Sequence, residues 1–202
     1  MKIYIVRHGE SVDDIEDCYG GIADFPLTDA GRETAEKLAS KLANTSIKIL
    51  YTSPYKRAHE TASIICKKLG CELKVIDDLR ERNSYGVLSG VNKKKAEEIF
   101  SGILAKLKYE PGDFYSDELV TGAEPLDEFA SRVREAFNKV VEDGEGQNII
   151  GIVTHGNVTR AIYRYILGIK TKVKPSLLAI TVIDFQPVVV ELNREQTQGV
   201  EM

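Results

Sequence analysis

Two stretches decide the fold: residues 2–9, KIYIVRHG, and residues 149–156, IIGIVTHG. Each is a short apolar run rich in β-branched residues that ends in a histidine followed by a glycine. This pattern is typical of a buried strand that runs into a sharp turn. Because the carboxyl ends of parallel strands meet at one edge of an open sheet, we expect His8 and His155 to lie close together there.

Strand-like and helix-like segments alternate outside these two runs. Strands are also expected at residues 47–52, 72–76, 177–185 and 188–192, and helices at 28–42, 53–69, 93–107, 125–140 and 157–167. Ser53 is expected to cap the second helix, with Pro54 in its first helical position. Strands separated by helices predict an α/β fold with three layers, in which helices cover both faces of a mostly parallel central sheet.

The length of 202 residues predicts a single domain over residues 1–202. One segment departs from the regular alternation, because residues 109–125 contain Pro, Gly, Asp and Ser in the manner of a loop. We therefore predict that residues 93–125 form a small cap or lid excursion within the domain. The polar residues from Arg194 onward are expected to fray.

Composition and charge exclude several classes of protein. Hydrophobic residues make up 43% of the chain, which is enough for a core and argues against a disordered protein. The net charge is −4, which argues against a nucleic-acid or membrane-surface partner, since both need a cationic face. No apolar run is long enough for a transmembrane helix. Three cysteines without metal-ligand spacing predict a reducing, cytoplasmic location, and a homodimer remains open.

Three more charged residues follow predicted strands and join the two histidines. They are Arg7, Arg57 and Glu81, so two imidazoles, two guanidiniums and a carboxyl group are expected at one sheet edge. The third histidine, His59, lies about 200° around its helix from Arg57 and is expected to face away. A three-histidine metal site therefore has little support, and no metal is predicted.

At this point the chain resembles the histidine phosphatase superfamily, the phosphoglycerate-mutase-like proteins. The resemblance rests on RHGES (7–11), LTDAGRETA (27–35), SPYKRAHETA (53–62), LRERNSYGVLSG (79–90) and VTHGN (153–157). A looser match is GAEP (122–125) with the later pair Arg132-Val133. The motifs follow the family order along most of the chain, which is more specific than any one of them.

The resemblance implies a role for each residue of the constellation. His8 would be the nucleophile that accepts the phosphoryl group, and Glu81 would give a proton to the leaving oxygen. Arg7, Arg57 and His155 would form the phosphate pocket. The chemistry suits these roles, because neutral imidazole is a good nucleophile near pH 7 and arginine holds phosphate oxygens in a bidentate manner. The resemblance also makes further residues candidates for substrate binding: Ser11, Tyr85, Lys93, Gly156 and Asn157.

The chain departs from the family pattern in two places that bear on the substrate. Many members have Asn where this chain has Asp14, and a carboxylate beside a phosphate is unfavourable unless it is paired or turned away. Either that loop points outward or the substrate is less anionic than a bisphosphate. The excursion also lacks the adjacent Arg pair of the mutases, although Lys93 occupies the place of a substrate-binding lysine in those enzymes.

These observations favour a metal-independent phosphomonoesterase that acts on a small phosphorylated metabolite through a phosphohistidine and needs no cofactor. One alternative is a phosphoglycerate mutase dependent on 2,3-bisphosphoglycerate, which would then be its cofactor. Another is a protein phosphatase or a non-catalytic phosphate-binding module on the same fold. The fate of the phosphoryl group separates the hydrolase from the mutase, and a phosphoenzyme separates both from a binding module.

Overall fold

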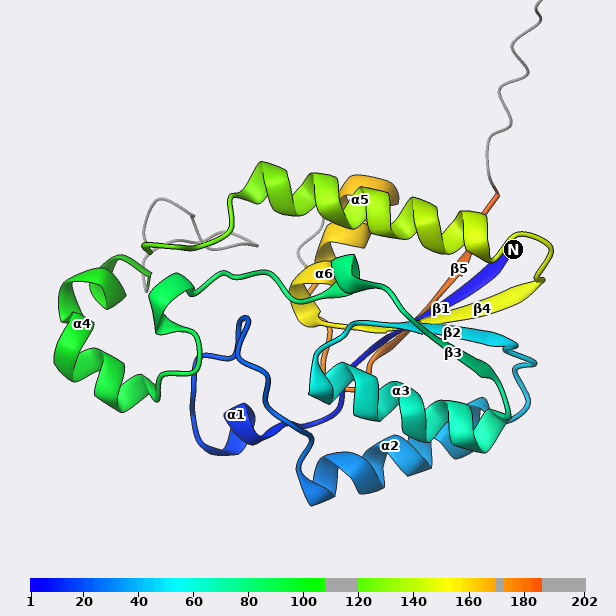
Figure 1. The fold of residues 1–202 in the computed structure, drawn as a ribbon, viewed down its shortest axis with the longest axis horizontal. Helices are drawn as coiled ribbons and strands as arrows, with labels where there is room; N and C mark the ends of the chain where they lie inside the picture. The colour runs from blue at the N-terminus through cyan, green and yellow to red at the C-terminus, as the bar shows by residue number, and fades with distance from the viewer. Residues whose placement is uncertain (108–119, 170–172, 187–202) are drawn as a thin grey trace, which may run out of the picture.

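A five-stranded sheet forms the middle layer of the computed structural model, which describes residues 1–107, 120–169 and 173–186 (Figure 1). The strand order is β3-β2-β4-β1-β5. The three pairs from β3 to β1 are parallel, and β5 joins β1 in the antiparallel direction. The prediction of a mostly parallel sheet is confirmed. The strands are β1 (Lys2–Arg7), β2 (Ile49–Thr52), β3 (Glu72–Val75), β4 (Ile149–Thr154) and β5 (Ile180–Asp184).

Helices cover both faces of this sheet, as predicted. One face carries α2 (Asp29–Leu42) and α3 (Lys56–Leu69), and the other carries α5 (Leu126–Asp143) and α6 (Gly156–Ala161) (Figure 1). Thr28 is the predicted cap of α2, since its hydroxyl accepts a hydrogen bond from the Gly31 N–H at 2.8 Å.

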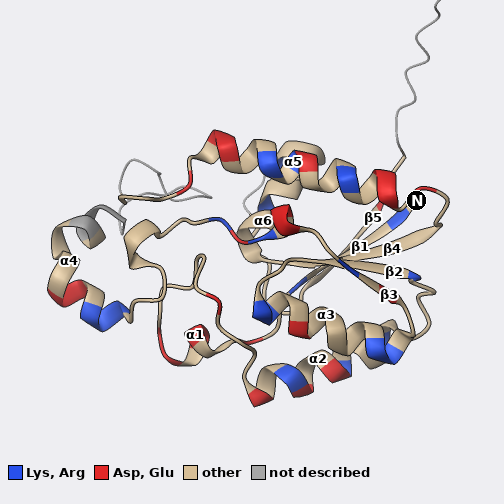
Figure 2. Ribbon diagram, viewed as in Figure 1, with Lys and Arg blue, Asp and Glu red and all other residues tan. Residues whose placement is uncertain are grey.

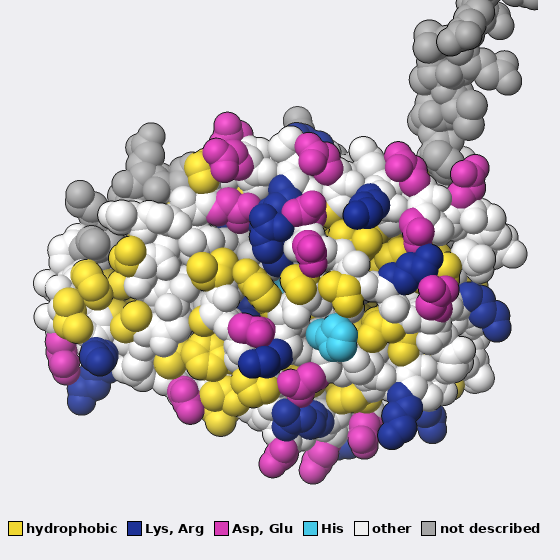
Figure 3. Space-filling model, in the orientation of Figure 1, with side chains coloured by type: hydrophobic (Ala, Val, Ile, Leu, Met, Phe, Trp, Pro, Cys, Tyr) yellow, Lys and Arg dark blue, Asp and Glu magenta, His cyan; other side chains and the backbone are white. Residues whose placement is uncertain are grey.

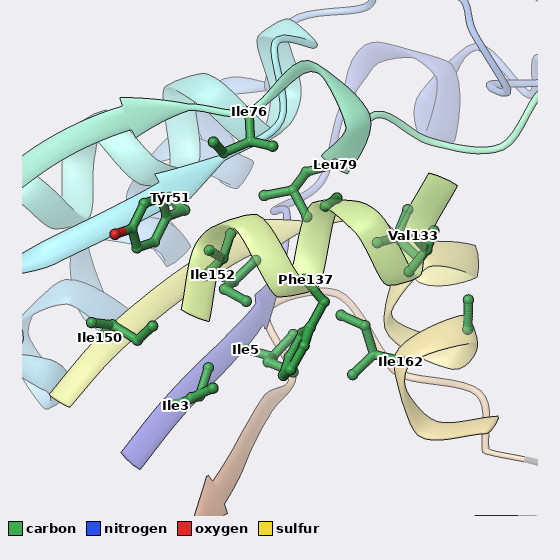
Figure 4. Close-up of a cluster of buried hydrophobic side chains, with 14 of the residues drawn as sticks. Ile3, Ile5, Tyr51, Ile76, Leu79, Val133, Phe137, Ile150, Ile152 and Ile162 are labelled. Atoms are coloured by element: carbon green, nitrogen blue, oxygen red, sulfur yellow. The ribbon is translucent and has the colours of Figure 1, made fainter. Parts of the chain in front are cut away.

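The core beneath α5 shows how the sequence pattern produces these layers. Phe129, Val133, Phe137 and Val140 recur at helical spacing and are almost fully buried. Figure 4 shows Phe137 among isoleucines of β1 and β4, such as Ile5 and Ile152. A second apolar cluster lies on the other face, between the sheet and the buried sides of α2 and α3.

Four further helices and turns lie beyond the carboxyl ends of the parallel strands, where the site was predicted (Figure 1). They are α1 (Val12–Ile15), the 3-10 turns η1 (Asp77–Leu79) and η2 (Gly86–Leu88), and α4 (Lys93–Leu107). Helix α4 has the predicted bounds, with a non-helical residue at Phe100. Residues 108–119 of the predicted cap excursion, and the strand expected at 188–192, are outside the described residues.

Two predictions about helix ends were wrong. Helix α3 begins at Lys56 with Tyr55 as its N-cap, so neither Ser53 nor Pro54 has the expected capping role. The physical reason is that the Ser53 side chain is engaged elsewhere: its oxygen accepts the Tyr55 N–H at 3.2 Å and contacts His155. The helix expected at 157–167 is α-helical only to Ala161 and continues as a π-helical turn, η4 (Ile162–Ile166).

Charges of both signs are mixed along the helices of the described residues. Figure 2 shows acidic and basic residues interspersed along α2 and α5, and on the face seen in Figure 3 the two kinds of side chain lie beside each other. Asp17, which follows acidic α1, forms an ion pair with Lys93 at the basic start of α4. Among the described residues, no helix is both long and apolar enough to cross a membrane.

Candidate active site

Strand pairing brings the two predicted histidines together. β1 and β4 are in parallel register with Arg7 opposite Thr154, so His8 and His155 leave the two strands at the same level. Their ring centroids are 5.1 Å apart, and both side chains are buried. The prediction that these histidines lie close together at the carboxyl edge is therefore confirmed.

The hydrogen bonding of His8 determines which of its nitrogens carries the proton. Nδ1 lies 2.7 Å from the Gly9 carbonyl oxygen, which can only accept, so Nδ1 is the donor and Nε2 holds the free lone pair. Burial lowers the pKa of His8 well below its usual 6.5, and the positive charges of Arg57 and Arg7 lower it further. His8 is thus a neutral imidazole at neutral pH.

His155 is held by Ser53, the residue that follows the neighbouring strand β2. Its Nε2 lies 2.8 Å from the Ser53 hydroxyl, while Nδ1 is buried without a hydrogen-bond partner among the described residues. Burial, followed by the charge of Arg57, also lowers the pKa of His155 well below 6.5. A buried polar nitrogen without a partner is rare and indicates a place where a ligand would bind.

The Arg57 guanidinium is fixed from one side by backbone carbonyls. Arg57 lies in the first turn of α3, is 2% exposed, and donates to the oxygens of Ala23 at 2.7 Å and Gly21 at 2.9 Å. These bonds use two of the five N–H groups of the side chain. A guanidinium held in this way has little conformational entropy left to lose when it binds an anion.

Arg7, at the end of β1, lies near the two histidines, and its charge acts on both of them. One of its terminal nitrogens donates to the Pro175 oxygen at 2.7 Å, and its Nε is buried without a partner among the described residues. A Cβ atom placed on Gly156 would lie 3.5 Å from this Nε, so any larger side chain would crowd the guanidinium. Helix α6 thus begins directly beside Arg7, with room for an alanine but not for a larger side chain at position 156.

Glu81 follows η1 in the chain and contacts the first turn of α6. Its Oε1 accepts the Arg82 N–H at 2.8 Å, and its Oε2 accepts the Asn157 N–H at 3.3 Å. The carboxyl group is only partly buried. The predicted acid is thus adjacent in space to the residues that follow His155, although more than 70 positions separate them in the sequence.

The candidate substrate-binding residues outside this group have partners of their own. The buried Ser11 hydroxyl donates to Asp13 at 2.6 Å, and the Tyr85 ring packs on Tyr19 with centroids 4.9 Å apart. Lys93 is ion-paired with Asp17. The structure thus places Ser11, Tyr85 and Lys93 in contacts within the loops beyond the sheet.

Asp14, the acidic residue that replaces the usual Asn, directs its carboxylate toward the N-terminal end of α1. Its carboxylate is exposed and accepts the Ser11 N–H at 2.9 Å. Of the two alternatives that the sequence left open, this geometry fits the outward-pointing loop, because the carboxylate is already paired with a backbone donor.

Sequence reasoning missed two residues that contact His155. Besides Ser53, the Tyr55 ring meets the His155 ring edge-on with centroids 5.6 Å apart, and the Arg57 guanidinium lies over it at 5.4 Å. Both residues follow β2 directly. The argument from strand ends that selected His8 could have found them, but the dipeptide Ser53-Pro54 was interpreted as a helix start.

The assembled group of side chains is suited to a compact anion. It combines two guanidiniums and two neutral imidazoles, and two of its buried nitrogens, Arg7 Nε and His155 Nδ1, have no hydrogen-bond partner in the part of the chain that the structure describes. His59 lies apart from this group, with its ring beside the Ser63 hydroxyl at 3.4 Å. In the ranges that the structure describes, no three His, Cys, Asp or Glu side chains gather as a metal site would require.

Comparison with known proteins identifies relatives along almost the whole chain. The model of the histidine phosphatase superfamily (branch 1) matches residues 3–195. Phosphoglycerate mutase-like protein 4 of Arabidopsis thaliana is 34% identical over 165 residues, which are 80% of this chain and 69% of that protein.

Of two further relatives, one is named as a mutase and the other as a phosphatase. A 2,3-bisphosphoglycerate-dependent phosphoglycerate mutase of Cytophaga hutchinsonii is 32% identical, over 81% of this chain and 76% of its own. A putative phosphoserine phosphatase 2 of Hydrogenobacter thermophilus is 32% identical, over 83% and 79%. The crystal structure of the alpha-ribazole phosphatase from Shigella flexneri shares the fold, with a TM-score of 0.78, 22% identity, and coverage of 92% of this chain and 91% of that one.

Proposed function

This chain belongs to the histidine phosphatase superfamily, and we propose on that basis that it hydrolyses phosphate monoesters of small metabolites through a phosphohistidine at His8. One observation carries the proposal: Arg7, His8, Arg57 and His155 converge at one sheet edge, where the buried nitrogens Arg7 Nε and His155 Nδ1 have no hydrogen-bond partner among the described residues. Phosphoryl oxygens would supply acceptors for the guanidinium N–H groups.

His8 is suited to the role of nucleophile by its protonation state. Its Nδ1–H is held by the Gly9 carbonyl, so the lone pair on Nε2 is available for attack on phosphorus. The lowered pKa keeps the ring neutral, so no proton has to leave before attack. The fixed guanidiniums of Arg7 and Arg57 would stabilise the charge on the equatorial oxygens of the transferred group.

The first chemical step would transfer the phosphoryl group to the enzyme. The bond between His8 Nε2 and phosphorus forms while the bond from phosphorus to the ester oxygen breaks, and the bonding electrons leave with that oxygen. Glu81 in its acid form gives the oxygen a proton, so that an alcohol departs. The product is phosphohistidine, with Glu81 as a carboxylate.

The second step would return the enzyme to its starting state. The Glu81 carboxylate takes a proton from a water molecule whose oxygen attacks phosphorus, and the bond to Nε2 breaks. Inorganic phosphate leaves, His8 is neutral again, and Glu81 is again an acid. In this scheme the residues of the chain account for every proton, and we propose no metal or cofactor.

The mutase is the second candidate, because a relative of similar identity carries that name. It shares the first step, but the phosphoryl group would then pass to a second hydroxyl of the substrate. Lys93, the residue that motivated this alternative, is ion-paired with Asp17. A lysine neutralised in this way is a weaker ligand for a second anionic group, and this observation favours the hydrolase.

A phosphorus NMR time course with 3-phosphoglycerate, with and without catalytic 2,3-bisphosphoglycerate, tests the proposal. Inorganic phosphate released without isomerisation supports the hydrolase, while 2-phosphoglycerate formed only with the bisphosphate supports the mutase. If the acid is not a substrate, the same assay with a panel of phosphomonoesters follows. The variant His8→Ala is expected to lose the acid-labile phosphoenzyme and the turnover, and retained activity would refute the proposal.

A further inference from the structure

A buried ion pair lies directly behind the loop that carries Glu81. Arg132, on the buried side of α5, donates through Nε to Glu124 Oε1 and through Nη2 to Glu124 Oε2, both at 2.8 Å. The side chains are only 9% and 16% exposed. Such a bidentate pair is planar and rigid, and breaking one partner of a buried pair is costly.

The remaining nitrogen of Arg132 holds the loop before Glu81. Its Nη1 donates to the carbonyl oxygens of Asp78 at 2.7 Å and Arg80 at 3.1 Å. All three guanidinium nitrogens are therefore engaged, and two of the contacts reach the backbone on the N-terminal side of Glu81. A lysine at this position could not make the same hydrogen bonds, since its ammonium group is a single charged centre without the planar, forked N–H groups of a guanidinium.

Glu124 holds the same loop from the other side. Its carbonyl oxygen accepts the Nε of buried Arg82 at 3.1 Å and the Nη2 at 2.8 Å. Its N–H donates to the Asn83 oxygen at 2.8 Å. The side chain of Glu81, in contrast, is bonded only to the backbone N–H groups of Arg82 and Asn157 among the described residues. Its position thus depends on the backbone that Arg132 and Glu124 fix.

We propose that Arg132 and Glu124 form a positioning clamp for Glu81, which sets the distance from its carboxyl group to the leaving oxygen. The inference rests on the proposed function, because Glu81 is the proton donor in that scheme. Neither clamp residue touches the reacting atoms. Proton transfer needs a donor within about 3 Å of its acceptor, and a displacement of about 1 Å costs on the order of 100-fold in rate.

The dependence of rate on the leaving group distinguishes this role from a purely structural one. p-Nitrophenolate leaves readily as an anion and needs little help from an acid, whereas phenolate is a poorer leaving group and gains more from a proton. The two phosphate esters are similar in size. Because Glu81 also acts in the second step, which is the same for both esters, the comparison uses kcat/KM, which reports only the steps up to the phosphoenzyme. A displaced Glu81 therefore lowers kcat/KM selectively for phenyl phosphate, whereas damage to the phosphate pocket lowers it for both esters alike.

The experiment measures kcat and KM for both esters in the wild type, Arg132→Lys, Glu81→Gln and the double variant. Arg132→Lys is expected to lower kcat/KM about 30-fold or more for phenyl phosphate but less than about 3-fold for p-nitrophenyl phosphate. In the Glu81→Gln background, Arg132→Lys should lower kcat/KM by less than about 3-fold for either ester. The carboxylic acid that Arg132 positions is already absent there.

Two further variants keep the test decisive. Arg32→Lys is the matched control, because Arg32 also donates two bonds to one glutamate, Glu60, on α3. It should leave both esters unaffected. If Arg132→Lys does not fold, Glu124→Gln tests the same pair with a side chain of equal size.

Equal losses on both esters, or a loss that persists without Glu81, would overturn the clamp. A wild type that hydrolyses neither these esters nor any of the phosphomonoesters in the panel would overturn the proposed function itself, and the clamp with it.

Discussion

The Nε2 atom of His155 lies 2.8 Å from the Ser53 hydroxyl, although 102 positions separate the two residues in the sequence. Parallel pairing of β2 with β4 brings them together, since Thr52 is opposite Val153 in the register. Ser53 also receives the Tyr55 N–H, so its oxygen has a fixed place at the start of α3. The bond orients a buried imidazole that would otherwise be free to rotate.

Ser53→Ala is therefore expected to lower kcat/KM by about tenfold, since one net hydrogen bond is worth about 1 kcal/mol and the ring also loses its orientation. Steady-state kinetics on p-nitrophenyl phosphate measure the effect. Ser63→Ala is the matched control, because its hydroxyl lies beside His59 on the same helix, away from the site. A loss of equal size in both variants would contradict the assignment.

The lowered pKa values of His8 and His155 predict how stability depends on pH. The unfolded chain binds protons on these residues at their ordinary pKa of 6.5, whereas the folded chain does not. Stability from this source is therefore fully present above pH 6.5 and is lost as the pH falls below it.

Urea unfolding between pH 5.0 and 7.5 measures this dependence in a window above the usual carboxylate titrations. We expect the midpoint to be flat above pH 6.5 and to fall below it. His8→Gln should reduce the slope in the acid range, and His59→Gln, which removes a histidine outside the pair, is the control. A slope in His8→Gln as steep as that of the wild type would contradict the prediction.

Asp14→Asn restores the amide that many family members have at this position. Because the Asp14 carboxylate is exposed and already accepts the Ser11 N–H, we expect the inhibition constant of inorganic phosphate to change by less than about threefold. Competitive inhibition of p-nitrophenyl phosphate hydrolysis gives this constant. A gain in phosphate affinity of about tenfold or more would mean instead that the carboxylate acts on the bound anion.

Gly31→Ala tests why glycine stands in the first turn of α2. A Cβ atom there would lie 2.1 Å from the backbone oxygen of Glu10, in the loop that follows His8. The helix and this loop would have to move apart, so we expect a loss of about 2 kcal/mol in unfolding free energy and a lower kcat. Both are measured on the purified variant.

The control for that substitution lies in α4. A Cβ on Gly102 would meet nothing within 4 Å among the described residues, and alanine favours a helix. Gly102→Ala is expected to be neutral or to stabilise the protein by up to about 1 kcal/mol. If Gly31→Ala were equally harmless, the close approach of α2 to the loop after His8 would not constrain the fold.

Much of this protein could be predicted without a structure because the signals are local. Hydrophobic periodicity identified most of the strands and helices, and an apolar run ending in His-Gly marks a buried strand wherever it occurs. Because parallel strands align their carboxyl ends, His8, His155 and Arg57 could be assigned to one edge from their positions in the sequence alone.

Local signals were ambiguous where one residue type serves two purposes. Ser-Pro after a strand is a sound helix start, yet Ser53 turned out to face His155. The register of β2 and β4 decides whether Ser53 caps a helix or bonds to His155. Residues 53–54 themselves do not determine that register. The same holds for Arg132, whose helix periodicity places it on the buried side of α5 without showing what it contacts there.

The sequence by itself thus determined the alternation of elements, the family and the edge at which the charged residues gather, because each depends on neighbours along the chain. Only the tertiary structure decided which nitrogen of His8 is free and what holds Glu81. These depend on Gly9, on the backbone at Asn157 and on the Arg132 pair, groups whose distances are set when separate strands and helices pack. Burial then lowers the pKa of both histidines, which is a property of the folded interior rather than of the residues.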